Sequence, residues 1–245
     1  MKAKRIILRI INDLITCIVC VFLLIVGTYS VYAIWDNNQI YAEVDDVMNE
    51  VLQKKPDVSN PGPGFEELSA INADVCAWLT LDGTKIDYPV LQGEDNLTYI
   101  NRNVYGDFAL SGSIFLDARC DNTFHGMYSL LYGHHMAERK MFGDLEKYED
   151  VDFFSQNTTG TLILKDRSYA LKIFACMRVS SADSVIFSPG LWQSDADGLV
   201  NYVYTNALHK NESVMQEEQG KQVLAMSTCS SAYTDARTVV LAYMK

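Results

Sequence analysis

Residues 14–34 form an unbroken run of 21 residues without a single charge, in a chain of 245 residues. As a helix rising ~1.5 Å per residue, this run would extend ~31 Å, about the thickness of the hydrocarbon core of a bilayer. Lys2, Lys4, Arg5 and Arg9 precede it, and acidic residues follow it. By the positive-inside rule, we expect residues 14–34 to cross the bilayer with the N-terminus in the cytoplasm and the remaining chain outside the cell membrane.

A cleaved signal peptide is the alternative for this segment. The sequence Val31-Tyr32-Ala33 loosely resembles a cleavage site. The apolar core of a signal peptide is usually ~7–15 residues long, and this run is longer. The length therefore favours a retained, single-pass anchor.

The expected exported part, residues 36–245, is strongly acidic. It holds 16 basic and 30 acidic residues, a net charge of about −14, and the whole chain carries −11. A protein that clamps nucleic acid needs a basic face to neutralise phosphates. We therefore expect no nucleic-acid partner.

Three regions follow from the distribution of apolar and helix-breaking residues. Residues 1–35 would be the cytoplasmic basic tail and anchor. Residues 36–64 would be a juxtamembrane region, with apolar residues at helical spacing over 41–55 and the breaker-rich linker PDVSNPGPG over 56–64. Residues 65–245 would form the main folded domain, which is long enough to bury its own core.

Short strands dominate the expected domain. Asp82-Gly83 lies between two apolar runs, which is typical of a hairpin over residues 78–91. Further strands are expected at 113–117, 128–133, 161–165, 169–178, 222–228 and 238–244. Helices are expected at 65–74, 96–103, 138–150 and 188–210. We therefore predict a mainly β fold, a closed barrel of about eight strands with N-terminal helices and a long helix inserted before residues 222–228.

Three side chains at expected strand ends could perform acyl transfer. His134 lies in YGHHM, Cys229 ends the segment STC, and Arg237 lies eight residues beyond that cysteine. A thiolate attacks an amide carbonyl, an imidazole protonates the departing nitrogen, and a fixed cation stabilises the oxyanion. Each residue alone has a more ordinary explanation: a buried or disulfide-bonded cysteine, a surface histidine pair, or a solvated arginine. The combination of all three favours catalysis.

The combined motifs resemble those of the sortases, membrane-anchored cysteine transpeptidases of Gram-positive bacteria. YGH and STC match the family's histidine and nucleophile segments, and GSIFLD (112–117) and MFGDLEKY (141–148) resemble flanking segments. The resemblance implies that His134, Cys229 and Arg237 are catalytic and that no metal or other cofactor takes part. The N-terminal helices and the long insertion before the nucleophile strand are similar to class B members.

The class B resemblance also implies a substrate and a set of binding residues. The expected substrates are exported proteins with a C-terminal Asn-Pro-x-Thr-type sorting motif, and the acceptor is an amine of a peptidoglycan precursor or cross-bridge. The implied substrate-binding residues are Asn96, Ile100, Ser181, Val185, Ile186, Ser227 and Thr228.

Other functions fit less well or stay open. A cysteine hydrolase would use the same residues with water as acceptor, and the sequence does not separate it from a transferase. The residues before Cys229 differ from the Ser-His-Gly-type motif of L,D-transpeptidases, and a papain-like protease has its cysteine before its histidine. A non-catalytic anchored binding domain would have an unreactive Cys229. Disulfides among Cys76, Cys120, Cys176 and Cys229 stay open as well.

Overall fold

The computed structural model describes residues 2–218, 220–229 and 235–245, which divide into two compact units, 1–43 and 44–245. Helix α1 (Lys2–Leu52) supplies the first unit, and its last nine residues belong to the second. The stretch Lys4–Leu52 is long and apolar enough to cross a membrane. This is compatible with the predicted anchor.

The second unit is built on one sheet that closes on itself. Within the described ranges the strand order is β5-β1-β2-β3-β4-β8-β9-β6-β7, and β5 also pairs with β6. Eight strands therefore form a closed barrel, and the two-residue β7 extends one edge. The strands are β1 (Val75–Leu81), β2 (Asp87–Leu91), β3 (Ile114–Leu116), β4 (Tyr128–Tyr132), β5 (Thr159–Ile163), β6 (Ser168–Ser180), β7 (His209–Lys210), β8 (Val223–Cys229) and β9 (Ala236–Met244). The predicted closed barrel of about eight strands is confirmed.

Two of the eight strand pairs that close the barrel, β2–β3 and β4–β8, are parallel and the others are antiparallel, and this pattern decides where the strand ends meet. β4 pairs in parallel with β8, and Tyr132 lies opposite Ser227. β8 then pairs with β9 in antiparallel orientation, which brings Cys229 opposite Arg237. The predicted hairpin at Asp82-Gly83 joins the antiparallel β1 and β2. Gly83 has φ +74°, which a glycine adopts without steric cost.

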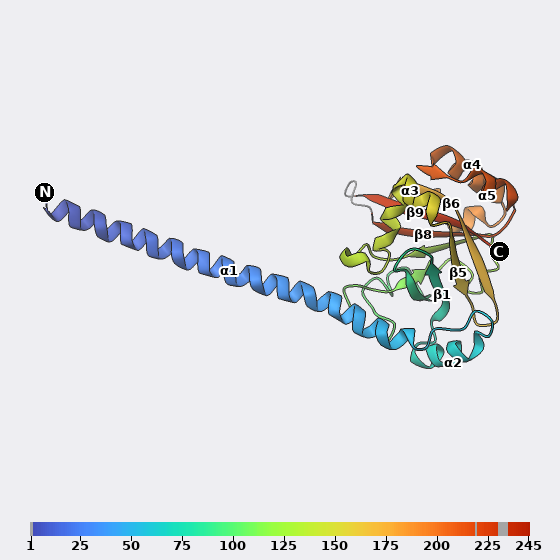
Figure 1. Cartoon of the computed structure of the whole chain (residues 1–245), viewed down its shortest axis with the longest axis horizontal. Coiled ribbons are helices and arrows are strands. Elements are labelled where there is room, and N and C mark those ends of the chain that lie inside the picture. Colours follow the sequence, from blue (N-terminus) through green and yellow to red (C-terminus); the bar gives the residue numbers. More distant parts are fainter. Residues whose placement is uncertain (1, 219, 230–234) are drawn as a thin grey trace. The chain divides into compact units, whose positions relative to one another are not determined.

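Helix α2 (Gly62–Ile71) begins inside the predicted linker and ends before residue 74. Pro63 fits there because the first turn of a helix needs no backbone N–H donor. Phe65 and Leu68 of α2 and Val51 of α1 are buried in a cluster beside β1. Figure 1 shows α2 at one end of this unit and α4 with α5 at the opposite end.

The expected helix over 96–103 was wrong, because the structure has consecutive turns there. The Asp95 carboxylate accepts hydrogen bonds from the backbone N–H groups of Leu97 and Thr98, at 2.9 and 2.8 Å. These bonds resemble a helix N-cap, but a helix does not continue from them. The Asn103 N–H donates to the Asp107 carbonyl oxygen at 2.9 Å, and the Tyr99 carbonyl oxygen accepts from the Ser113 N–H at 3.0 Å, whereas a helix would pair these two groups with each other.

The other two expected helices are divided into shorter pieces. Residues 138–150 form the 3₁₀ turns η1 (Ala137–Arg139) and η2 (Gly143–Glu149), followed by α3 (Val151–Gln156). Glu138, Arg139 and Met141 have positive φ, which interrupts a right-handed helix. The insertion holds η3 (Pro189–Trp192), α4 (Ala196–Asn206), β7 and α5 (Glu212–Glu217), because Asp195 and Asn211 each cap a new helix.

Candidate active site

The strand register brings the three predicted catalytic positions to one edge of the barrel. Tyr132 and Ser227 are paired on the parallel strands β4 and β8. His134 and Cys229 each lie two residues beyond that pair, so both follow at the same edge. Arg237 is opposite Cys229 on β9. The side chain of Cys229 lies outside the described residues, and its backbone is the last position of β8.

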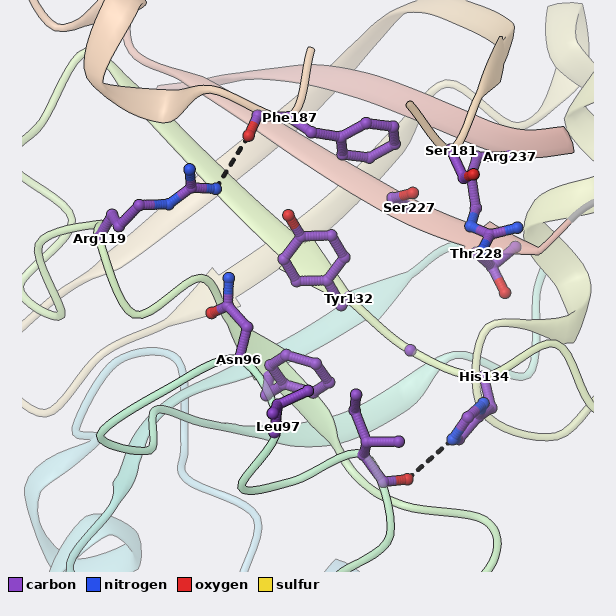
Figure 2. Close-up of a pocket in the computed structure, with 13 residues that line it drawn as sticks. Asn96, Leu97, Arg119, Tyr132, His134, Ser181, Phe187, Ser227, Thr228 and Arg237 are labelled. Carbon is purple, nitrogen blue, oxygen red and sulfur yellow. Dashed lines mark hydrogen bonds between the residues drawn. The ribbon is translucent and has the colours of Figure 1, made fainter. Parts of the chain in front are cut away.

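A pocket of about 440 Å³ opens at this edge. Figure 2 shows His134 and Arg237 at one end of it, with Thr228 between them, and Asn96 and Arg119 toward the other end. The thirteen lining residues come from the turns after β2, from β3 and β4 and the segments that directly follow these two strands, from β8 and β9, and from the loop after β6. They are Asn96, Leu97, Ile100, Phe115, Arg119, Tyr132, Gly133, His134, Ser181, Phe187, Ser227, Thr228 and Arg237.

His134 is held by a backbone carbonyl. Its Nε2 lies 2.8 Å from the carbonyl oxygen of Ile100. Because a carbonyl oxygen can only accept, Nε2 carries the hydrogen and donates it. The Nδ1 atom is therefore the ring nitrogen that is left to exchange a proton with a thiol or a departing amine.

Arg237 provides a positive charge at the same end of the pocket. Its guanidinium is partly exposed, and Nη1 donates to the carbonyl oxygen of Ala236 at 3.0 Å. Arginine stays protonated at any working pH. The arrangement thus supplies a permanent cation beside the position of the predicted nucleophile.

Two hydroxyl groups beside the nucleophile position are buried and available. Ser227 and Thr228 are each 2 % exposed. Within residues 2–218, 220–229 and 235–245, neither hydroxyl has a hydrogen-bond partner. A buried polar group without a partner is costly, so these two hydroxyls are suited to bind a polar group that enters the pocket.

The other end of the pocket is a polar network around Asp117, whose side chain is fully buried. Asp117 accepts hydrogen bonds from Arg119 Nε and Nη2, from Tyr132 Oη and from Asn96 Nδ2, at 2.6–3.0 Å. Burial opposes the ionisation of Asp117, but the hydrogen bonds from Arg119 outweigh it, so the pKa of the carboxyl lies below its usual value. Phe187 stacks on Tyr132, and its carbonyl oxygen accepts from Arg119 Nη2 at 2.9 Å.

Comparison with known proteins agrees with this geometry. The family model of the Sortase domain matches residues 79–245. This chain is a member of the sortase family. Sortase B of Staphylococcus aureus is 31% identical over 186 residues, covering 74% of each chain, and Sortase B of Listeria monocytogenes is 30% identical over 178 residues, covering 72% of each.

Solved structures give the same result for the fold. A Streptococcus pyogenes class B sortase involved in pilus biogenesis matches with a TM-score of 0.68 and 39% identity, over 74% of this chain and 97% of that one. A Staphylococcus aureus sortase B–substrate complex matches with a TM-score of 0.68 and 26% identity, over 86% and 96%. The protein is thus a sortase B-type cysteine transpeptidase.

The sortase pocket gathers five of the seven expected substrate-binding residues, and it leaves two out. Asn96, Ile100, Ser181, Ser227 and Thr228 line it. Val185 and Ile186 do not belong to the lining among the described residues. Their backbone N–H groups bond to Asp183, and Ile186 is fully buried in the core, with its carbonyl oxygen accepting from Tyr128 Oη. Phe187, the next residue, faces the pocket instead.

Sequence reasoning missed Arg119, Tyr132 and Phe187 as lining residues of this sortase. Tyr132 was visible as the first residue of YGHHM, the segment that supplied His134. Arg119 follows the GSIFLD segment by two residues. Phe187 carried no signal, because its position depends on where the loop after β6 crosses the barrel edge.

The second histidine of YGHHM points to a different partner. His135 Nε2 lies 2.8 Å from Glu146 Oε2, and both side chains are about 30 % exposed. This is the alternation expected for neighbouring residues at a strand end. It agrees with the assignment of His134, not His135, to the pocket.

The other cysteines of the second unit, residues 44–245, are poor nucleophiles. Cys76, Cys120 and Cys176 are free thiols. Burial raises the pKa of Cys76 to about 12 and that of Cys120 to about 11, and it raises the pKa of Cys176 further. Since the thiolate is the reactive form, these three residues stay inert at neutral pH.

Proposed function

We propose that this sortase cleaves an Asn-Pro-x-Thr-type sorting motif in exported proteins and joins the new carboxyl end to an amine of the cell wall. Cys229, His134 and Arg237 are the catalytic residues. The observation that carries the proposal is the register of β4, β8 and β9, which supports a shared site for residues 134, 229 and 237. Catalysis by such a group depends on holding the reacting atoms in one geometry.

The first half-reaction forms a thioester. The Cys229 thiolate attacks the threonine carbonyl carbon, a C–S bond forms, and the C–N bond to the next residue breaks. His134 gives a proton to the departing amine. The hydrogen bond from Nε2 to Ile100 supports Nδ1 as the donor of that proton.

The second half-reaction regenerates the enzyme. The wall amine attacks the thioester and loses its proton to His134, a C–N bond forms, and the C–S bond breaks to restore the thiolate. In both halves Arg237 stabilises the negative oxygen of the tetrahedral intermediate. Loss of one oxyanion donor typically costs ~10²–10³ in rate.

The anchor gives this chemistry its location. We place the N-terminus in the cytoplasm and the catalytic domain outside the membrane, because basic residues precede the apolar stretch. An enzyme held there meets exported substrates and wall precursors as they emerge.

The test uses the full chain in detergent micelles with a peptide library built around Asn-Pro-x-Thr-x. Mass spectrometry would detect the acyl adduct on Cys229, with and without an added amine. We expect an adduct that amine releases faster and that Cys229→Ala abolishes. His134→Ala and Arg237→Ala should each lower its formation by at least ~10².

Two other outcomes would change the assignment. Release at the same rate with and without amine would make the protein a hydrolase with water as acceptor. An alkylatable Cys229 that forms no adduct with any peptide would point to a different substrate class.

A further inference from the structure

The far end of the pocket is dominated by one buried carboxylate that touches three of the lining side chains. Asp117 follows β3, and its side chain is 0 % exposed. Its two oxygens accept from Asn96, Arg119 and Tyr132, and Oδ1 also accepts from the backbone N–H of Arg119 at 2.9 Å. A group that bonds to several neighbours at once fixes which of their atoms stay available for a ligand.

The hydrogen bonds to Asp117 determine which atoms of Tyr132 and Asn96 can still bind a ligand. Tyr132 uses its only hydrogen on Asp117, so the lone pairs of its oxygen face outward as an acceptor. Asn96 gives one N–H to Asp117, while its oxygen accepts from the backbone N–H of Ala118 at 2.7 Å. One N–H of Asn96 is therefore left as a donor.

Arg119 adds further donors without adding net charge. Its Nε and Nη2 bond to Asp117, and Nη2 also bonds to the Phe187 carbonyl oxygen. Within the described residues, Nη1 has no hydrogen-bond partner. The charge of the guanidinium is balanced by Asp117 at 2.6 Å. The far end is thus neutral and offers donors and one acceptor side by side.

We propose that Asp117 is a specificity-determining residue that makes the far end of the pocket select a primary amide over a carboxylate. An amide side chain can accept from Asn96 or Arg119 and donate to Tyr132 Oη. A carboxylate can also accept from Asn96 and Arg119, but it has no hydrogen to donate to Tyr132 Oη, so its charge would face the Tyr132 lone pairs at a site without net positive charge. This inference rests on the proposed function, because it assigns the amide to the asparagine of the sorting motif.

Replacing Asp117 with asparagine would reverse this preference. Arg119 would keep a full, unbalanced positive charge, and Tyr132 would be free to turn its hydroxyl hydrogen toward the pocket. Both changes favour a carboxylate ligand. A residue with only a structural role would weaken binding of amide and carboxylate peptides alike.

The experiment compares two peptides that differ only in Asn-Pro-x-Thr against Asp-Pro-x-Thr. Binding is measured by calorimetry on the full chain with Cys229→Ala, in detergent micelles, so that no cleavage is needed. We expect the parent to bind the asparagine peptide at least tenfold more tightly. Asp117→Asn should change the ratio of the two Kd values by at least tenfold toward the aspartate peptide.

A matched control and a second variant keep the result interpretable. Glu218 is another buried carboxylate, paired with Lys172 and Lys245 at 2.8 and 3.0 Å, and it does not line the pocket. Glu218→Gln should leave the Kd ratio unchanged. If Asp117→Asn does not fold, Tyr132→Phe tests the same idea, because it removes the acceptor and should erase most of the preference for asparagine.

The outcomes separate this inference from the proposed function. Equal affinity of the parent for both peptides, or an unchanged ratio in Asp117→Asn or Tyr132→Phe, would overturn the role of Asp117. The adduct on wild-type Cys229 is a separate readout. If no adduct forms on wild-type Cys229, the proposed function is overturned. A Kd ratio that still changes in Asp117→Asn would then continue to support amide selection at this end of the pocket.

Discussion

A Cβ atom on Gly112 would lie 2.3 Å from the carbonyl oxygen of Ile100, the same oxygen that accepts the hydrogen bond of His134. Gly112 has φ +58°, and its own loop returns to the 96–101 turns through the hydrogen bond from Ser113 N to Tyr99 O, at 3.0 Å. A glycine outside the pocket lining therefore supports the orientation of the histidine.

Gly112→Ala should lower the rate of adduct formation by about 10- to 100-fold, because moving the Ile100 carbonyl misplaces the imidazole. Gly106→Ala is the matched control. Gly106 also has positive φ, at +86°, but a Cβ atom there meets nothing within 4 Å. Both variants carry a backbone cost of about 1–2 kcal/mol. Equal rates for the two variants would show that the carbonyl does not orient His134.

The C-terminal end of α1 should support the loop that follows His134. Lys140 is almost buried and forms an ion pair with Asp45. The loop between His134 and Lys140 holds Glu138 and Arg139 at positive φ, a conformation that persists only where surrounding contacts enforce it. Asp45→Asn should raise amide hydrogen exchange across residues 134–142 and lower the rate of adduct formation about three- to tenfold, since it leaves the nearly buried Lys140 with the longer, 4.0 Å ion pair to the exposed Glu138.

The control for this pair is an exposed acid in a comparable ion pair. Glu217 pairs with Lys172 at 3.6 Å on α5, away from the pocket lining. Glu217→Gln should leave both exchange in residues 134–142 and the rate unchanged. If amide hydrogen exchange across residues 134–142 is the same in Asp45→Asn and in the parent, α1 does not hold this loop.

Acid should destabilise the fold partly through two buried carboxylates. The pKa values of Asp117 and Asp144 lie below the usual Asp value, because hydrogen bonds from Arg119 and Arg139 outweigh burial. A carboxyl with a lowered folded-state pKa contributes stability that is present above about pH 4 and is lost as the pH falls through that lower value. The Tm of wild type should drop between pH 5 and pH 2.5, and Asp117→Asn should start lower and drop by less. If the Tm of wild type and the Tm of Asp117→Asn fall by the same amount over this pH range, the contribution of Asp117 is contradicted.

Alkylation should distinguish Cys229 from Cys76, Cys120 and Cys176. Cys120 and Cys176 are buried and Cys76 is partly buried, and desolvation raises the pKa of all three thiols, which keeps them protonated at neutral pH. Iodoacetamide at pH 7.5 should therefore modify Cys229 at least about tenfold faster than any of these three, with parallel loss of activity. Peptide mapping by mass spectrometry gives the four rates. Faster labelling of Cys76 would show that its site opens readily.

The strands and the catalytic motifs could be predicted because each depends on local sequence. The runs around residues 128–133 and 222–228 are apolar enough to define buried strands, and YGHHM and STC mark their ends. The partners of those strands could not be predicted in the same way. The parallel pairing of β4 with β8 joins segments about ninety residues apart, and only the closed barrel fixes it.

Hydrogen bonds to other segments explain most of the remaining differences. The segment 96–103 had the composition of a short helix, but the Asn103 N–H donates to the Asp107 carbonyl oxygen and the Tyr99 carbonyl oxygen accepts from Ser113, so the pair that a helix would form is not made. Phe187 takes the pocket position expected for Val185 and Ile186, because Asp183 binds the backbone of those two residues and turns them inward. The role of Asp117 was hidden because its partners come from three separate segments.

The barrel order also determines when the barrel can close. β8 and β9 lie between β4 and β6, so both neighbours have unpaired edges until residues 223–244 are in place. β8 and β9 follow the other strands of the barrel in the sequence, so they are synthesised last among them. They also carry Cys229 and Arg237. Closure of the barrel and assembly of the proposed catalytic group are therefore one event, and a chain truncated before β8 would achieve neither.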